Sequence, residues 1–229
     1  MKDKNDILNN KVYAITNYIT NFFITNLWFL VMISPIIIYI YIFEGNISMS
    51  ILLLLSILVG PALTALFSIM GKLVREGDIA PTKDFFHFYK MNFLQSLLVG
   101  IILNILISIT YFDMNYFSSK GNKYFSYIFL ALLALIIMLS IYIYPIISRY
   151  NIKIVHLFKI SIKLLIKKIY ISLSCISIII IVLGLVRITR LSLVGVLFGV
   201  SIIGYLIMRM EKNIIDELEE EIKEKYKNI

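Results

Sequence analysis

The residues best placed to do chemistry are five polar or small residues at strict four-residue spacing inside one apolar segment. They are Asn92, Ser96, Gly100, Asn104 and Ser108. Residues four apart lie on one face of a helix, with a slow drift. Amides and hydroxyls on such a face can hydrogen-bond to a neighbouring helix, or they can line a water-filled path. The stripe predicts helix packing or a translocation path, and the sequence leaves both open.

Two other apolar segments carry small residues at the same spacing. They are Gly60, Thr64 and Ser68 in one segment, and Gly195 and Gly199 in another. Small residues let helices in a membrane approach closely. Pro61 lacks an amide donor, so we expect the helix to kink there and to leave a carbonyl for a neighbour to satisfy. Such a kink can serve as a hinge.

Motifs for catalysis and for cofactor or metal binding are not found. The only Gly-Lys step, Gly71-Lys72, lacks the glycine five residues earlier that a P-loop requires, and no GxSxG or HExxH motif occurs. His87 and His156 have no partner at metal-ligand spacing, and Cys175 is the single cysteine. We therefore predict a protein that is not an enzyme and that has no catalytic, cofactor or metal site.

The segments that hold these residues are long and apolar. The 229 residues are 60% hydrophobic and 16% charged, whereas soluble domains are about half apolar and about a quarter charged. About 20 helical residues cross a bilayer. We predict an all-α, multi-pass membrane protein with one membrane domain over residues 1–229, six spans free of Asp, Glu, Lys and Arg, and a charged helical tail. The spans are 22–43, 47–71, 91–112, 124–148, 169–186 and 191–208, and the tail is 209–229.

The distribution of positive charge predicts the orientation. Of the 22 Lys and Arg residues, 18 lie in the N-terminal segment, in alternate connections and in the tail, and 4 lie in the other connections. Basic loops stay in the cytoplasm, so both termini are expected there. This also accounts for the net charge of +8 without a nucleic-acid partner. No small-residue cleavage site follows the first span, which is expected to remain as an anchor.

The connection 149–168 is strongly basic, with six cations and no anions. The cations singled out as docking or lipid contacts are Arg149, Lys153, Lys163 and Lys167. Apolar residues at three- and four-residue spacing are Ile152, Val155, Phe158, Ile162 and Leu165. The pattern predicts an amphipathic helix at the inner surface. Its partner is either a bilayer with anionic headgroups or a cytoplasmic subunit, such as the motor subunit of a transporter.

Two further segments carry weaker patterns. Pro81 and the aromatic run 85–89 predict a short surface helix whose aromatic side chains lie in the membrane interface. The tail 209–229 is expected to be a solvated helix with i,i+4 pairs. The pairs are Glu219 with Lys223 and Glu221 with Lys225.

Several motifs together resemble those of the YesL-like family of bacterial membrane proteins, known as domain of unknown function 624. The motifs are Asn26-Leu27-Trp28, residues 60–66 (GPALTAL), 72–76 (KLVRE), 84–86 (DFF) and 90–96 (KMNFLQS), Asp113, Tyr144-Pro145 and Arg149-Tyr150. The resemblance covers about residues 26–169 and implies about six spans in the cytoplasmic membrane of a bacterium, mostly Gram-positive. Members tend to be encoded beside carbohydrate ABC-transporter components and glycoside hydrolases. The family supplies no catalytic residues.

Three functional hypotheses follow. The first is an accessory or regulatory subunit associated with carbohydrate ABC-type uptake, with the basic helix and the 92–108 stripe as contact surfaces. The alternative is a permease subunit or small-solute transporter in its own right, in which Asn104 lines the path and Pro61 is a hinge. A membrane enzyme or lipid-handling protein would need a carboxylate or histidine cluster that the sequence does not show.

Overall fold

The computed structural model describes residues 11–44, 46–189 and 192–227, and only the helical backbone for residues 11–12 and 219–227. Every element assigned in this part is an α-helix, which confirms the all-α fold. The helices are α2 (Lys11–Ile42), α3 (Met49–Ser56), α4 (Val59–Glu76), α5 (Pro81–Ser119), α6 (Lys123–Ile147), α7 (Ile154–Lys167), α8 (Ile169–Ile188) and α9 (Ser192–Lys227).

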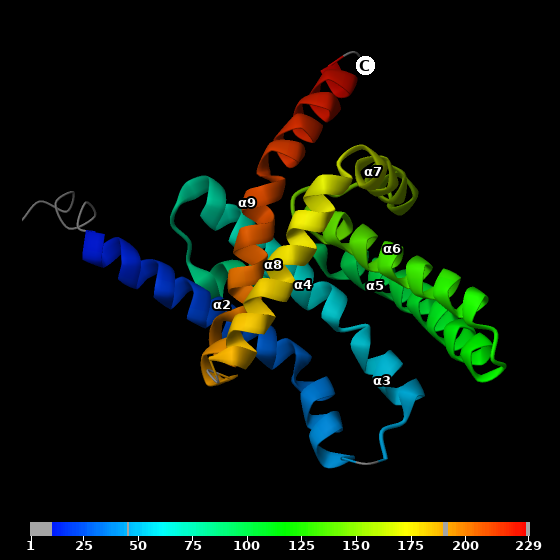
Figure 1. Ribbon diagram of the computed structural model, residues 1–229. Helices are drawn as coiled ribbons and strands as arrows, with labels where there is room; N and C mark the ends of the chain where they lie inside the picture. The colour runs from blue at the N-terminus through cyan, green and yellow to red at the C-terminus, as the bar shows by residue number, and fades with distance from the viewer. Residues whose placement is uncertain (1–10, 45, 190–191, 228–229) are drawn as a thin grey trace, which may run out of the picture.

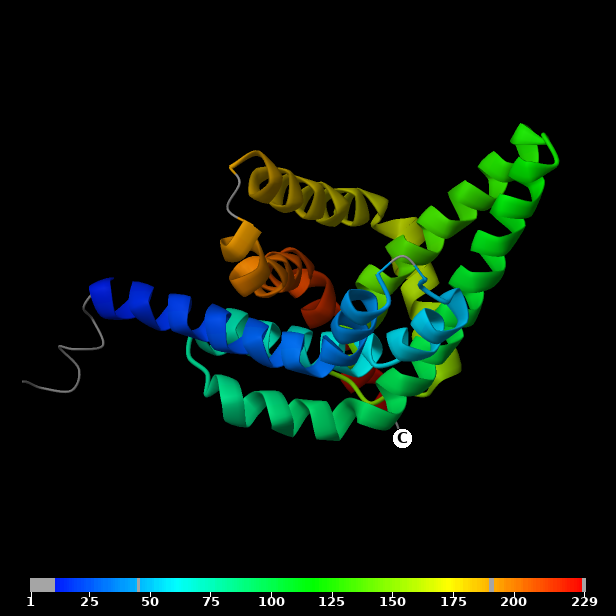
Figure 2. The same cartoon turned by 90° about the horizontal axis from the view of Figure 1, so that it is seen from below.

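Six helical segments of the described chain are long and apolar enough to cross a membrane, which confirms the predicted number. The second consists of α3 and α4 together, and α7 is the helix that does not span. In Figure 1, α7 and the end of α9 lie at the upper end of the molecule, and α3 lies at the lower end. The far end of the α5–α6 hairpin projects away from the other helices (Figures 1 and 2).

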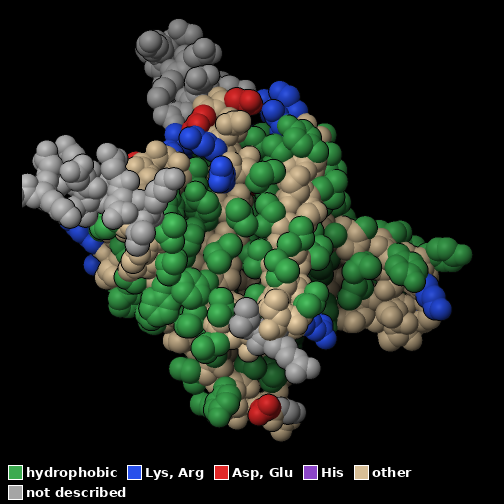
Figure 3. Space-filling view, turned by 60° about the vertical axis from the view of Figure 1, so that its left-hand side comes forward, with side chains coloured by type: hydrophobic (Ala, Val, Ile, Leu, Met, Phe, Trp, Pro, Cys, Tyr) green, Lys and Arg blue, Asp and Glu red, His purple; other side chains and the backbone are tan. Residues whose placement is uncertain are grey.

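The core is built around α4. It contacts α2, α5, α6 and α9, and its residues from Gly60 to Met70 are buried apart from Leu63. The other described helices keep long apolar faces outward, as a helix surrounded by lipid does. Figure 3 shows hydrophobic side chains over the middle of one face, with Lys, Arg, Asp and Glu mainly toward its ends.

The second span is broken before Pro61 rather than at it. Helix α3 ends at Ser56 and α4 begins at Val59, so Pro61 lies in the first turn of α4, where its missing amide leaves no helical hydrogen bond unmade. The carbonyl of Ile57, which Pro61 cannot reach, accepts from the Gly60 amide at 3.3 Å. The predicted kink is thus a two-residue interruption three residues upstream.

The surface helix predicted near Pro81 is not separate, because α5 runs without interruption from Pro81 to Ser119. The first turn of α5 contains the acidic residue Asp84, which forms an ion pair with Lys72 of α4. Asp84 accepts from Lys72 Nζ at 2.8 Å and from the Ala80 amide at 3.0 Å. Trp28 of α2 donates to Thr82 Oγ1 at 3.1 Å. The segment therefore packs against α2 and α4 as the first part of α5.

The tail is helical, as predicted, but one face of its first half is buried. Helix α9 continues without interruption from Ser192 to Lys227. Glu211, Ile214 and Ile215 are each at most 3% exposed. This face of the tail therefore packs against the protein instead of facing solvent. The side-chain pairs predicted beyond residue 218 lie outside the described part of the structure.

Candidate functional site

The inner half of the polar stripe on α5 faces α4. Asn92, Ser96 and Gly100 are buried, as are Gly60 and Thr64 across from them. A Cβ atom added to Gly60 would lie 2.7 Å from the Ser96 carbonyl oxygen and 3.4 Å from Gly100 Cα. The two backbones therefore touch at this crossing, and a side chain at position 60 would not fit there.

Hydrogen bonds extend this contact toward the end of α6. Asn92 Nδ2 of α5 donates to Ser68 Oγ of α4 at 3.4 Å, and Ser68 Oγ donates to the Ser148 carbonyl, just after α6, at 3.1 Å. Thr64 and Ser96 bond within their own helices. We call the buried set Gly60, Thr64, Ser68, Asn92, Ser96 and Gly100 the polar seam. It joins three helices and is closed to solvent.

The outer half of the stripe lies in different surroundings. Asn104 and Ser108 are partly exposed, and they face α3. Ser56 Oγ donates to Asn104 Oδ1 at 2.8 Å. Both stripe residues line an open groove of about 430 Å³ between α3 and α5. We call it the outer groove; it is lined by Leu53, Leu54, Ile57, Ile101, Asn104, Ile105, Ser108, Ile109 and Phe112.

The two glycines of α9 have different surroundings. A Cβ on Gly195 would clash with Val186 of α8, whereas a Cβ on Gly199 would meet nothing within 4 Å. Gly204, which the spacing did not single out, approaches Leu66 of α4 closely. The close contacts of α9 thus fall at Gly195 and Gly204.

A second contact missed from the sequence is the amide of Asn26. Its Nδ2 donates to the Val196 carbonyl at 2.6 Å, and its Oδ1 accepts from the Ser201 amide at 3.1 Å. Asn26 is fully buried. Its side chain therefore connects α2 to the α9 backbone through two hydrogen bonds that are shielded from solvent. An Asn in the first span was the available signal, because a buried amide in lipid needs partners.

Helix α7 is present, and it has three faces rather than two. Leu157, Ser161 and Leu164 are buried against the protein, while Val155 and Ile166 are 69% and 75% exposed. The lysines occupy the third face. Exposed apolar side chains beside lysines fit a helix at a membrane surface.

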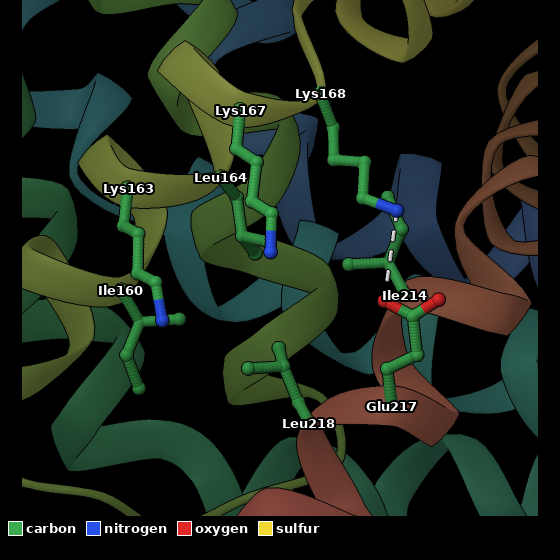
Figure 4. Close-up of a pocket in the computed structure, with 8 residues that line it drawn as sticks. All are labelled: Ile160, Lys163, Leu164, Lys167, Lys168, Ile214, Glu217 and Leu218. Carbon is green, nitrogen blue, oxygen red and sulfur yellow. Dashed lines mark ion pairs between the residues drawn. The ribbon is translucent and has the colours of Figure 1, made fainter.

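The four cations proposed as contacts separate into three groups. Arg149 precedes α7 and pairs with Asp216 of α9 at 2.7 Å, so it is not on the lysine face. Lys153 lies at the start of α7 and is exposed. Lys163 and Lys167 line a pocket between α7 and α9 (Figure 4).

This pocket, here called the inner pocket, combines lysines with an apolar floor. Lys163 and Lys167 extend from α7 toward α9, and Lys168 follows them from the junction with α8 (Figure 4). Lys168 Nζ lies 3.6 Å from Glu217 Oε2. The remaining lining residues are Ile160, Leu164, Ile214 and Leu218.

Glu211 is the ionisable residue that sequence reasoning missed. It is 1% exposed, and its Oε1 has no hydrogen-bond partner in the part of the chain that the structure describes. Neighbouring charges made the segment look like the end of the span. The usable signal was spacing, since Ile207, Glu211, Ile214 and Leu218 share one helical face. No group of three or more His, Cys, Asp or Glu among the described residues could hold a metal ion.

Six apolar helices around a buried polar seam define a multi-pass helical membrane protein. Residues 22–114 match the family model described as "Protein of unknown function, DUF624". This confirms the family that the motifs indicated, over the segment from α2 through most of α5. The motifs around Tyr144-Pro145 and Arg149-Tyr150 lie beyond the matched residues. No curated protein and no solved structure gives a significant match.

Within the matched segment, several motif residues make contacts between helices. Asn26 binds α9, Trp28 binds the start of α5, Lys72 pairs with Asp84, and Asn92 bonds to α4. The motifs of the matched segment therefore specify how its helices pack.

Proposed function

We propose that this chain is a non-enzymatic accessory subunit of carbohydrate ABC-type uptake in a bacterial cytoplasmic membrane, and that a transmembrane helix of a transporter subunit packs in the outer groove. The groove supplies the docking surface. The choice of a carbohydrate transporter as partner rests on the resemblance to the family and its genomic neighbourhood. The distribution of Lys and Arg supports an orientation with both termini in the cytoplasm.

The observation that carries the proposal is the state of Asn104. It lies in the middle of the third span, is partly exposed in the groove, and accepts a hydrogen bond from Ser56 through Oδ1. Its Nδ2 donates to none of the residues that the structure describes. An amide donor left unpaired in hydrocarbon is unfavourable, and such groups usually face a protein partner or water.

The lining of the groove favours a helix over a solute. Seven of its nine residues are apolar, and the polar pair is Asn104 and Ser108. A sugar needs many polar partners to replace its hydration, whereas an apolar helix needs close packing and one or two hydrogen bonds. The second candidate, a permease or small-solute transporter, is supported by the same polar pair lining a path.

Affinity purification in mild detergent tests the proposal. The wild-type chain should carry transporter subunits with it, and Asn104→Leu should lose them because the docking helix loses its hydrogen bond. Ser177→Leu on α8 is the matched control, since it also removes an exposed polar side chain from a span. It should retain the partners.

A second variant separates lost docking from a damaged fold. Ile105→Trp adds bulk in the groove at a side chain that is 53% exposed, so it should block docking while thermal stability stays at the wild-type value. Partner recovery that is unchanged in both groove variants would reject the docking surface. A wild-type chain that purifies alone and conducts solute in liposomes would favour the second candidate.

A further inference from the structure

The inner pocket lies at the depth where lipid headgroups begin. Helix α8, a candidate span, starts at Ile169, directly after Lys168 of the pocket. Helix α9 also lines the pocket, with Ile214, Glu217 and Leu218. The candidate span of α8 thus begins at the pocket, and α7 lies beside it. A ligand in the pocket would sit at the boundary between hydrocarbon and water.

The pocket has more positive than negative charge. Three ammonium groups, of Lys163, Lys167 and Lys168, face one carboxylate, of Glu217. Glu217 lies near Lys168, while Lys163 and Lys167 form no ion pair with any residue that the structure describes. The view in Figure 4 shows the side chains of Lys163 and Lys167 extending from α7 toward the α9 side of the pocket. Two such donors at one site suit an anion with several oxygen atoms.

The size of the pocket restricts that anion. The free space is about 50 Å³, whereas about 15 Å³ is enough to hold one water molecule. It therefore admits a group of a few heavy atoms, such as a phosphate, and not a sugar ring or a nucleotide base. The apolar floor of Ile160, Leu164, Ile214 and Leu218 offers no further polar partners.

The surface next to the pocket indicates where the phosphate comes from. Ile162 and Ile166 form an exposed apolar row on α7. It lies directly beside the row of Lys163 and Lys167, because residues four apart stack along a helix and the two rows differ by one position. Tyr170, at the start of α8, is also exposed. Acyl chains would cover such a surface, whereas a soluble phosphate would leave it bare.

From this arrangement we infer that the inner pocket binds the phosphodiester headgroup of an anionic glycerophospholipid, with its acyl chains against α7 and the start of α8. Lys163 and Lys167 hold the phosphate, and Lys168 adds positive charge from the junction of α7 and α8. The inference is independent of the outer groove and of any transporter partner. The lysine pattern in the sequence predicted only general adhesion to the bilayer. The inference adds a specific binding site for one lipid headgroup.

Native mass spectrometry of the full chain, titrated with phosphatidylglycerol or phosphatidylcholine, tests the inference. The wild type should retain phosphatidylglycerol in preference to phosphatidylcholine. The double variant Lys163→Gln with Lys167→Gln should bind phosphatidylglycerol about 30-fold more weakly, since each lysine near a membrane surface contributes about fivefold. The matched control is Lys153→Gln with Lys159→Gln, which makes the same charge change on the same helix outside the pocket. It should bind within about twofold of the wild type if the site is local.

Three results would overturn the inference. Equal loss of lipid in both double variants would show diffuse attraction to a charged helix. No loss in the pocket variant would show that the lysines do not hold the headgroup. Displacement of phosphatidylglycerol by inorganic phosphate at equal concentration would show that the acyl chains contribute nothing and that the ligand is a soluble phosphate. All variants are exposed lysine substitutions, so their thermal stability should match the wild type and folding is checked in the same samples.

Discussion

The closest backbone contact between helices is the crossing of α4 and α5, and Gly60→Ala tests it. The added Cβ would lie 2.7 Å from the Ser96 carbonyl oxygen, against 3.4 Å for an ordinary contact, so the backbones must separate by about 0.7 Å. The atom it meets is backbone and cannot rotate away. Overpacking of this kind costs about 1–3 kcal/mol. Separation would also weaken the bond from Asn92 to Ser68 in the polar seam.

Gly199→Ala is the matched control, because its Cβ would meet nothing within 4 Å. Replacing a helical Gly by Ala gains up to about 1 kcal/mol in helix propensity, so this variant should be neutral or more stable. The two variants should therefore differ by about 1–4 kcal/mol in the free energy of unfolding. The assay is reversible unfolding in mixed micelles, followed by circular dichroism. Equal stabilities would refute the close crossing of α4 and α5.

Three further substitutions test contacts elsewhere. Glu211→Leu should raise the free energy of unfolding by about 1–3 kcal/mol, because it removes a buried carboxyl with an unpaired oxygen; a less stable variant would reveal a partner for that group. Asn26→Leu should lower the free energy of unfolding by about 1–3 kcal/mol through loss of two interhelical hydrogen bonds, and an unchanged melting temperature would contradict this. A double-mutant cycle of Lys72→Met with Asp84→Asn should give a coupling of about 1 kcal/mol or more for the partly buried pair; additive effects would show that the pair contributes nothing.

The number of spans was predictable because hydrophobic length is set by the bilayer and not by neighbouring residues. The same holds for the helical nature of α7, where lysines and apolar residues alternate with the helical period. Both the length of an apolar segment and the helical period of α7 can be read from neighbouring residues in the sequence alone.

Helix boundaries were less predictable, because the residues near Pro81 were expected to form a surface helix separate from the third span. Lys72 and Asp84 pair with each other, so the helix can continue past Asp84 toward its start at Pro81. Glu211 is enclosed by α9 and its neighbours rather than by water. Whether a helix continues and packs beyond a charged side chain depends on partners that are distant in the sequence, and a single-sequence window does not contain them.

The polar stripe shows the same limit within one helix. Four-residue spacing placed Asn92 through Ser108 on a common face, and the structure puts the inner residues against α4 and the outer ones in the groove with α3. The interruption at Ile57-Leu58 makes this difference, because α3 and α4 present separate surfaces to α5. Its position follows from packing at Gly60 and Gly100 as well as from Pro61, and spacing alone did not reveal it.

The most direct test of the proposed function is photo-crosslinking in the native membrane from inside the outer groove. A photoreactive amino acid at Ile105, which lines the groove, is compared with one at Ile180 of α8, which is outside it and 64% exposed. The account predicts a discrete adduct with a carbohydrate-transporter subunit from position 105 and lipid adducts from position 180. Lipid adducts alone at both positions would contradict it.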